Sequence, residues 1–147
     1  MGLDMYLYKK NYIGANYEHN HINGTLALKR EEEPINIDIN KIVYIIENQA
    51  YWRKANQIHN WFVQNVQHGE DDCKPYEVSG EKLLELVDLC KKVLANHSLA
   101  EELLPTCEGF FFGSYDYDEY YFEDIESTIE QLSDIDPDEY YEYQSSW

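Results

Sequence analysis

The chain has 147 residues, which is enough for one domain with its own hydrophobic core. Its 29 Asp and Glu against 11 Lys and Arg give a formal net charge of −18. This charge argues against direct binding of nucleic acid or of an anionic membrane surface, since both require a basic surface. The longest apolar runs, such as 42–46, are far shorter than the ~20 residues that span a bilayer, and no signal-peptide pattern opens the chain.

The three cysteines, Cys73, Cys90 and Cys107, cannot all pair with one another, and no C-x-x-C motif occurs. We therefore expect reduced thiols in the cytosol. No domain boundary is evident, and the sequence predicts a single domain over residues 1–147.

Charge divides sharply along the chain. Residues 1–67 contain seven acidic and seven basic residues, whereas residues 68–147 contain 22 acidic and four basic residues. No Lys or Arg follows Lys92. The first part can therefore form a local positive site, while the second generates a strong negative field.

Alternation with a period of two predicts a strand over residues 2–8 with one buried face. Residues 16–30 predict a hairpin around Asn23-Gly24, the favoured two-residue turn, and 31–34 predict a solvated break. Residues 35–39 alternate again over a short segment. The β-branched run 42–47 predicts a buried central strand.

From residue 49 to 66 the apolar period becomes helical, and a second helix is expected over 80–95 with Ser79 as its N-cap. Residues 99–104 predict a short helical turn and 118–135 a third helix. The run 110–113 predicts a strand or buried loop, and 140–147 a final strand. Together these elements predict an α+β fold, with a mixed or antiparallel sheet and about three helices packed on one face.

Four stretches are similar to motifs of one known family. They are MGLDMYL (1–7), YWRKANQIHNWFV (51–63), EGFFFGS (108–114) and the ending SSW (145–147). Together they resemble a family of small uncharacterised proteins of phages and prophages. The resemblance implies a phage setting, the cytosol of the host cell, and an anti-defence role of the kind many small phage proteins have. It implies no catalytic residues.

One candidate ligand site lies in the predicted helix 49–66. Its members are Trp52, Arg53, Lys54, Asn56 and His59. Trp offers a stacking surface for a base, Arg and Lys donate to phosphate, and Asn and His can bond ring edges or ribose hydroxyls. The alternative is a helix whose Trp residues pack in the core and whose polar residues cover the edge of that core.

A second candidate is the aromatic segment that follows Gly113-Ser114, in which tyrosines could line a pocket and stack on a purine. The tyrosines concerned are Tyr115, Tyr117 and Tyr121. Gly113-Ser114 before a helix could offer amide groups to an anion. Asp116 and Asp118 favour the alternative, in which these acids cap the helix N-terminus.

Metal and enzyme motifs are weakly represented. His19 and His21 would face the same side of a strand, but no third ligand has a convincing spacing, so we expect no metal and no cofactor. No G-x-S-x-G, Walker A or G-x-G-x-x-G motif occurs. Cys73 beside Asp71 and Asp72 is unfavourably placed for a nucleophile.

Three functions follow, in order of preference. The first is non-catalytic sequestration of a nucleotide-derived host immune signal, similar to cyclic ADP-ribose. The second is an acidic decoy, in which the segment 134–143 mimics a phosphate backbone and binds a basic host protein; its alternative is a solvated surface. The third is a small nucleotide hydrolase that uses His59 with Asp4 or a tail carboxylate. The sequence leaves open whether the chain is a homo-oligomer.

Overall fold

The computed structural model describes residues 2–14, 16–20 and 24–147, which form two compact units. Unit 1 comprises residues 1–9 and 48–147, and unit 2 comprises residues 10–47. Unit 2 consists of the ends of two long strands and the segment that joins them. The single domain over 1–147 stays a prediction.

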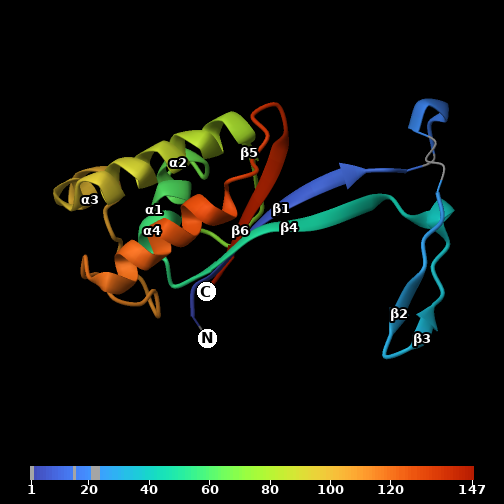
Figure 1. Cartoon of the computed structure of the whole chain (residues 1–147), viewed down its shortest axis with the longest axis horizontal. Helices are drawn as coiled ribbons and strands as arrows, with labels where there is room; N and C mark the ends of the chain where they lie inside the picture. Colours follow the sequence, from blue (N-terminus) through green and yellow to red (C-terminus); the bar gives the residue numbers. More distant parts are fainter. Residues whose placement is uncertain (1, 15, 21–23) are drawn as a thin grey trace. The chain divides into compact units, whose positions relative to one another are not determined.

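An antiparallel four-stranded sheet has the order β4-β1-β6-β5 (Figure 1). Its strands are β1 (Asp4–Tyr12), β4 (Tyr44–Arg53), β5 (Tyr76–Ser79) and β6 (Tyr140–Ser146). Burial alternates along β1 and β6, so that Met5 and Leu7 are fully buried while Tyr6 and Tyr8 on the opposite face are partly exposed. One face of the sheet is therefore covered, as expected for strands with a period of two.

Four α-helices accompany this sheet among the described residues. They are α1 (Asn56–Asn65), α2 (Gly80–Ala95), α3 (Ala100–Leu103) and α4 (Glu119–Gln131). Short 3-10 helices lie at Glu18–Asn20, Ile39–Lys41 and His97–Leu99. The predicted α+β class is confirmed, and none of the helices in the described part of the chain has the length and apolarity to cross a membrane.

The core of unit 1 lies between the covered face of the sheet and the helices. Phe62 of α1 stacks on Tyr143 of β6, with ring centroids 3.8 Å apart and planes 5° from parallel. Helix α2 packs beside α4 (Figure 1) and begins as predicted, because the Ser79 hydroxyl accepts the backbone N–H of Lys82 at 3.2 Å. The predicted bounds of this helix are confirmed.

The predicted helix over 49–66 is wrong in its first third. Residues up to Arg53 belong to β4, and α1 begins only at Asn56. Ala50 and Trp52 are both buried while Tyr51 between them is exposed, and this spacing of two is that of one face of a strand rather than of a helix. The backbone N–H of Lys54 donates to Leu3 O at 2.8 Å, so main-chain bonding toward the start of β1 replaces the helical hydrogen bonds here.

The prediction of a buried central strand over 42–47 is also wrong. Tyr44, Ile45 and Ile46 are 53%, 47% and 55% exposed, and β4 is an edge strand of the sheet. A β-branched run favours extended backbone, but burial requires covering elements from elsewhere in the chain. Among the described residues of unit 2, no helix is longer than one turn, so none covers this part of β4.

The hairpin of unit 2 lies further along the chain than predicted. Strands β2 (Leu28–Arg30) and β3 (Glu33–Ile35) pair antiparallel around Glu31 and Glu32. These two residues have φ of 49° and 67°, the positive values that a two-residue hairpin turn requires. The segment 31–34, predicted as a solvated break, thus contains the turn of the observed hairpin. The predicted turn at Asn23-Gly24 includes Asn23, which lies outside the described residues.

Candidate functional site

A cleft of about 530 Å³ opens beside the N-terminal half of α4, and we call it the α4 cleft. All of its lining residues belong to unit 1. They are Arg53, Lys54, Gln57, Gly113, Ser114, Asp116, Asp118, Tyr120, Tyr121, Glu123 and Asp124. The volume is in the range typical of small-molecule sites.

Two cations, Arg53 and Lys54, come from the point where β4 ends. Lys54 has a φ of 59°, so the backbone turns sharply between β4 and α1. A Cβ added to Gly113 would lie 3.1 Å from Lys54 Cβ and 3.3 Å from Lys54 O. Gly113, whose φ is +94°, therefore allows the loop before α4 to approach the Lys54 turn closely.

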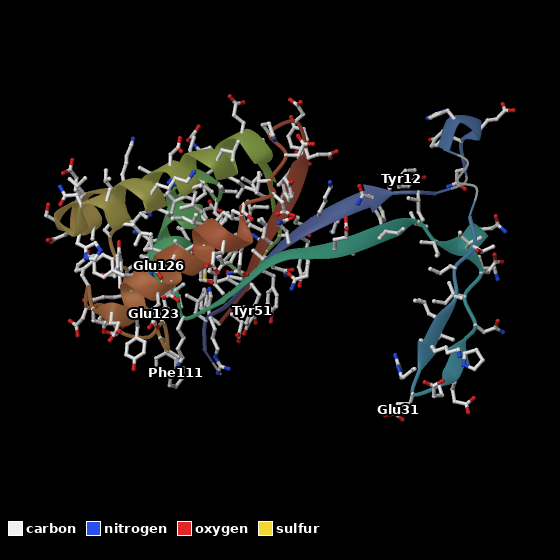
Figure 2. All side chains as sticks on the ribbon, viewed as in Figure 1. Tyr12, Glu31, Tyr51, Phe111, Glu123 and Glu126 are labelled. Atoms are coloured by element: carbon white, nitrogen blue, oxygen red, sulfur yellow. The ribbon has the colours of Figure 1, made fainter. Side chains whose placement is uncertain are left out.

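Carboxylates also line the cleft. Asp118 caps α4, since its Oδ1 accepts the backbone N–H of Tyr121 at 3.1 Å, which confirms the predicted capping role. Figure 2 marks Glu123 on α4 and Phe111 in the loop that precedes this helix. Four carboxylates thus lie in the cleft with the two cations, so the site is amphoteric rather than simply basic.

Asp124 is the carboxylate with the most altered acidity in the cleft. Burial raises the pKa of this carboxyl to about 6, and the charges of Glu123 and Asp118 act in the same direction. Gln57, whose Nε2 lies 3.4 Å from Asp124 Oδ2, acts in the opposite direction. The same amide donates to Tyr121 O at 3.2 Å and so joins α1 to α4 at the floor of the cleft.

Of the five residues predicted from the segment after residue 51, only Arg53 and Lys54 line the cleft. Trp52 is buried, and its Nε1 donates to Thr128 Oγ1 at 2.9 Å. Asn56 is buried too; its Nδ2 donates to the carbonyl oxygens of Phe112 and Ser114 at 3.2 and 2.8 Å. The alternative interpretation, in which these side chains belong to the core, describes both residues.

His59 lies in the core at the centre of a hydrogen-bond chain. Its Nε2 is 3.0 Å from Asp71 Oδ1 and its Nδ1 is 2.7 Å from the Tyr143 hydroxyl. Burial lowers the pKa of His59 despite the opposing effect of Asp71, so the ring is neutral. A neutral ring beside a carboxylate donates from Nε2 to Asp71 and accepts the Tyr143 O–H at Nδ1.

His59 is not accessible to a ligand, because the side chain is fully buried and both ring nitrogens are hydrogen-bonded to Asp71 and Tyr143. Asp4 is engaged elsewhere, since it accepts the Tyr51 hydroxyl at 2.5 Å. The His59–Asp4 pair of the hydrolase hypothesis is therefore not formed. The other version of the hydrolase hypothesis, in which His59 acts with a tail carboxylate, is disfavoured for the same reason, because His59 is buried.

Only one of the three predicted tyrosines lines the cleft, and it is Tyr121. Its hydroxyl donates to Leu104 O at 2.8 Å, which directs the polar end into the core. The Tyr115 hydroxyl donates to Gly109 O at 3.2 Å, and the Tyr117 hydroxyl accepts the backbone N–H of Thr106 at 3.3 Å. Both of these hydroxyl groups thus form hydrogen bonds within the segment that precedes α4.

Four residues that line the cleft were not among the predicted site residues: Gln57, Tyr120, Glu123 and Asp124. Tyr120, Glu123 and Asp124 have the i, i+3, i+4 spacing that lines one face of a helix, which was a usable signal. Gln57 carried no such signal, since its role depends on the approach of α4 to α1.

The cysteines give no support for nucleophilic chemistry. Cys73, Cys90 and Cys107 are all free thiols. Burial raises the pKa of Cys90 to about 12 and that of Cys107 to about 11, so neither forms a thiolate at neutral pH. Of the predicted histidine pair, His21 lies outside the described residues.

No protein-family model, curated protein or solved structure matches this chain. The similarity to phage and prophage proteins stays a prediction.

Proposed function

We propose that this protein binds and sequesters a nucleotide-derived ligand in the α4 cleft without chemical turnover. The observation that supports this function is the convergence of Arg53 and Lys54 on one cleft with Tyr120. Guanidinium and ammonium groups bind phosphate oxygens, and an exposed tyrosine ring can stack on a base. Tyr120 is 73% exposed, so its ring is accessible to a ligand.

The carboxylates of the cleft narrow the class of ligand. Two cations can neutralise two phosphate charges, whereas Asp116, Asp118, Glu123 and Asp124 repel any further negative charge. Carboxylates also accept hydrogen bonds from ribose hydroxyls. These features favour a ligand with two phosphate charges and free hydroxyl groups, such as cyclic ADP-ribose or ADP-ribose, over a nucleoside triphosphate.

Sequestration fits this chemistry better than turnover, because His59 is buried and engaged with Asp71 and Tyr143. In a phage setting, which the sequence similarity implies, removal of a host immune signal would protect the infecting phage. The phage setting is part of the proposal.

Isothermal titration calorimetry tests the proposal with cyclic ADP-ribose, ADP-ribose and ATP as probes. We expect binding of a diphosphate probe that is at least tenfold tighter than binding of ATP. The Arg53→Gln variant should bind at least tenfold more weakly, whereas Arg30→Gln, which alters an exposed arginine of unit 2, should bind as the wild type does. Chromatography of the released ligand should recover it unchanged.

Two results would overturn the proposal. One is the absence of binding to all three probes, combined with the absence of any nucleotide released from denatured protein that had been mixed with host lysate. The other is equal affinity of the Arg53→Gln and wild-type proteins. Chemical conversion of the probe would instead support an enzyme, in which Asp124 is the group with a pKa suited to general acid catalysis.

One observation favours a second function, the acidic decoy. Residues 93–147 contain 15 acidic residues and no Lys or Arg, and Figure 2 marks Glu123 and Glu126 along α4. Such a surface can occupy the basic groove of a DNA-binding protein. This function predicts binding to a basic host protein that weakens as the salt concentration is raised. Asp138→Asn with Glu139→Gln, two exposed acidic residues of the segment 134–143, should weaken that binding as well. Arg53→Gln would leave decoy binding unaffected.

A further inference from the structure

Unit 2 exposes an unusual number of large apolar side chains for its size. Ten of them are between 37% and 58% exposed. They are Tyr12, Tyr17, Leu26, Leu28, Ile35, Ile37, Val43, Tyr44, Ile45 and Ile46. Scattered single exposures need no explanation, but a concentration within 38 consecutive residues marks an interaction surface.

The strand part of unit 2 is uncovered on both faces. Successive side chains of a strand point to opposite faces, so Tyr44 and Ile46 lie on one face of β4 and Ile45 on the other. All three are about half exposed. Among the described residues of these two strand ends, the one ring contact is that of Tyr44 with Tyr12, whose centroids are 5.3 Å apart.

A pair of strands with no covering layer is at best marginally stable in water. The hairpin of β2 and β3 is in the same condition, since all six of its strand residues are exposed. Unit 2 therefore needs an apolar partner surface to hold these segments in one conformation.

The exposed apolar area agrees with the requirement of a stable dimer. At about half exposure and side-chain areas on the order of 200 Å² each, the ten residues offer roughly 900 Å². A standard protein–protein interface buries about 800 Å² on each partner, whereas the largest apolar patch of an ordinary monomer is about 300–600 Å². Summed over both faces, the exposed apolar area of unit 2 is therefore comparable with what one partner contributes to a standard interface.

Charge indicates which partner fits. Unit 2 has four basic and six acidic residues, a net charge of −2, while the remaining residues have seven basic and 23 acidic, a net charge of −16. Two copies of this chain that met through unit 1 would repel each other strongly, whereas unit 2 carries almost no net charge. Its mixed signs also suit a two-fold interface, in which each surface meets its own copy.

We propose that unit 2 is a homodimerisation surface, through which two copies of the chain associate about a two-fold axis. Apolar side chains of β4 and of the β2–β3 hairpin form the contact. The α4 cleft lies wholly within unit 1, so the dimer does not depend on the ligand proposed above.

Sedimentation velocity and light scattering of the full chain test this proposal. The chain has a mass of 17.5 kDa, so a dimer doubles the measured mass. We expect a dimer at micromolar concentration that persists in 1 M NaCl, since apolar contacts survive screening of charge. A monomer at 100 µM would overturn the proposal, as would a dimer that dissociates on addition of salt.

Matched variants locate the interface. Tyr44→Ser with Ile46→Ser should raise the dimer dissociation constant at least tenfold, whereas Tyr140→Ser, at a 60% exposed tyrosine of unit 1, should leave it unchanged. If the double variant of β4 does not fold, Leu28→Ser with Ile35→Ser alters the paired hairpin positions instead. A dimer that neither pair of substitutions weakens would show that the interface lies elsewhere and would overturn the proposal.

Discussion

The buried chain from Asp71 through His59 to Tyr143 allows one sharp test of the structure. Tyr143→Phe removes a single hydroxyl, which lies 2.7 Å from His59 Nδ1, and both side chains are fully buried. The aromatic ring remains, so its stacking on Phe62 is preserved. The change therefore isolates one hydrogen bond and leaves the acceptor nitrogen of His59 without a partner.

The expected loss follows from that unsatisfied acceptor. A buried polar group that loses its partner costs about 1–3 kcal/mol of the free energy of unfolding. For a chain of this size each kcal/mol lowers the melting temperature by roughly 2–4 °C. Tyr140→Phe is the matched control, because it removes a tyrosine hydroxyl from the same strand at a residue that is 60% exposed.

Urea unfolding at pH 7 measures both variants. Trp52, Trp61 and Trp147 all belong to unit 1, so tryptophan fluorescence reports the unfolding of the unit that contains the chain. Far-ultraviolet circular dichroism should give the same midpoint for a two-state transition. If Tyr143→Phe and Tyr140→Phe agree within about 0.5 kcal/mol, the typical effect of a surface change, the buried hydrogen bond does not exist as described.

Further predictions concern acidity and access. Burial lowers the pKa of His59, so below pH ~6.5 the unfolded chain binds a proton at this residue that the native chain does not bind. The free energy of unfolding should therefore fall from pH 7 to pH 5 in the wild type, and fall less in His59→Gln. Urea unfolding of both proteins at the two pH values checks the sign. Burial instead raises the pKa of Asp124 to about 6, well above the ~3.9 of an unfolded Asp, so the ionised carboxylate destabilises the native chain in full at pH 7 and only in part at pH 5. Asp124→Asn should therefore raise the urea midpoint more at pH 7 than at pH 5, and an equal change at both would refute this prediction. At pH 8 a thiol reagent should label exposed Cys73 quickly and Cys90, with a pKa of about 12, only after unfolding; peptide mapping identifies the labelled residue, and rapid labelling of Cys90 would contradict its burial.

Elements with strong local signals were predictable. The bounds of α2 follow from a helical apolar period and from Ser79, whose capping bond is local. The buried face of β1 and the strand β6 follow from alternation alone. In these segments propensity, pattern and cap all favour the same conformation, so no distant residue was needed to decide it.

The candidate site could be predicted only in part. Arg53 and Lys54 were identified as cations near a pocket, but α1, which was expected to present them together with Trp52 and His59, begins only at Asn56 and contains His59 alone of these four. Trp52 and Arg53 instead lie at the end of strand β4, where successive side chains point to opposite faces of the sheet. Trp52 therefore points into the core.

By itself, then, the sequence determined what depends on neighbours along the chain: the α+β class, the helix after Ser79, the caps, and the excess of acid after residue 67. Only the tertiary structure decided what depends on distant segments. It brought Asp124 of α4 to Gln57 of α1, and it left the β-branched run of β4 without a cover. The physical reason is that periodicity determines which face of an element is apolar, whereas burial and pockets arise only where two such elements meet.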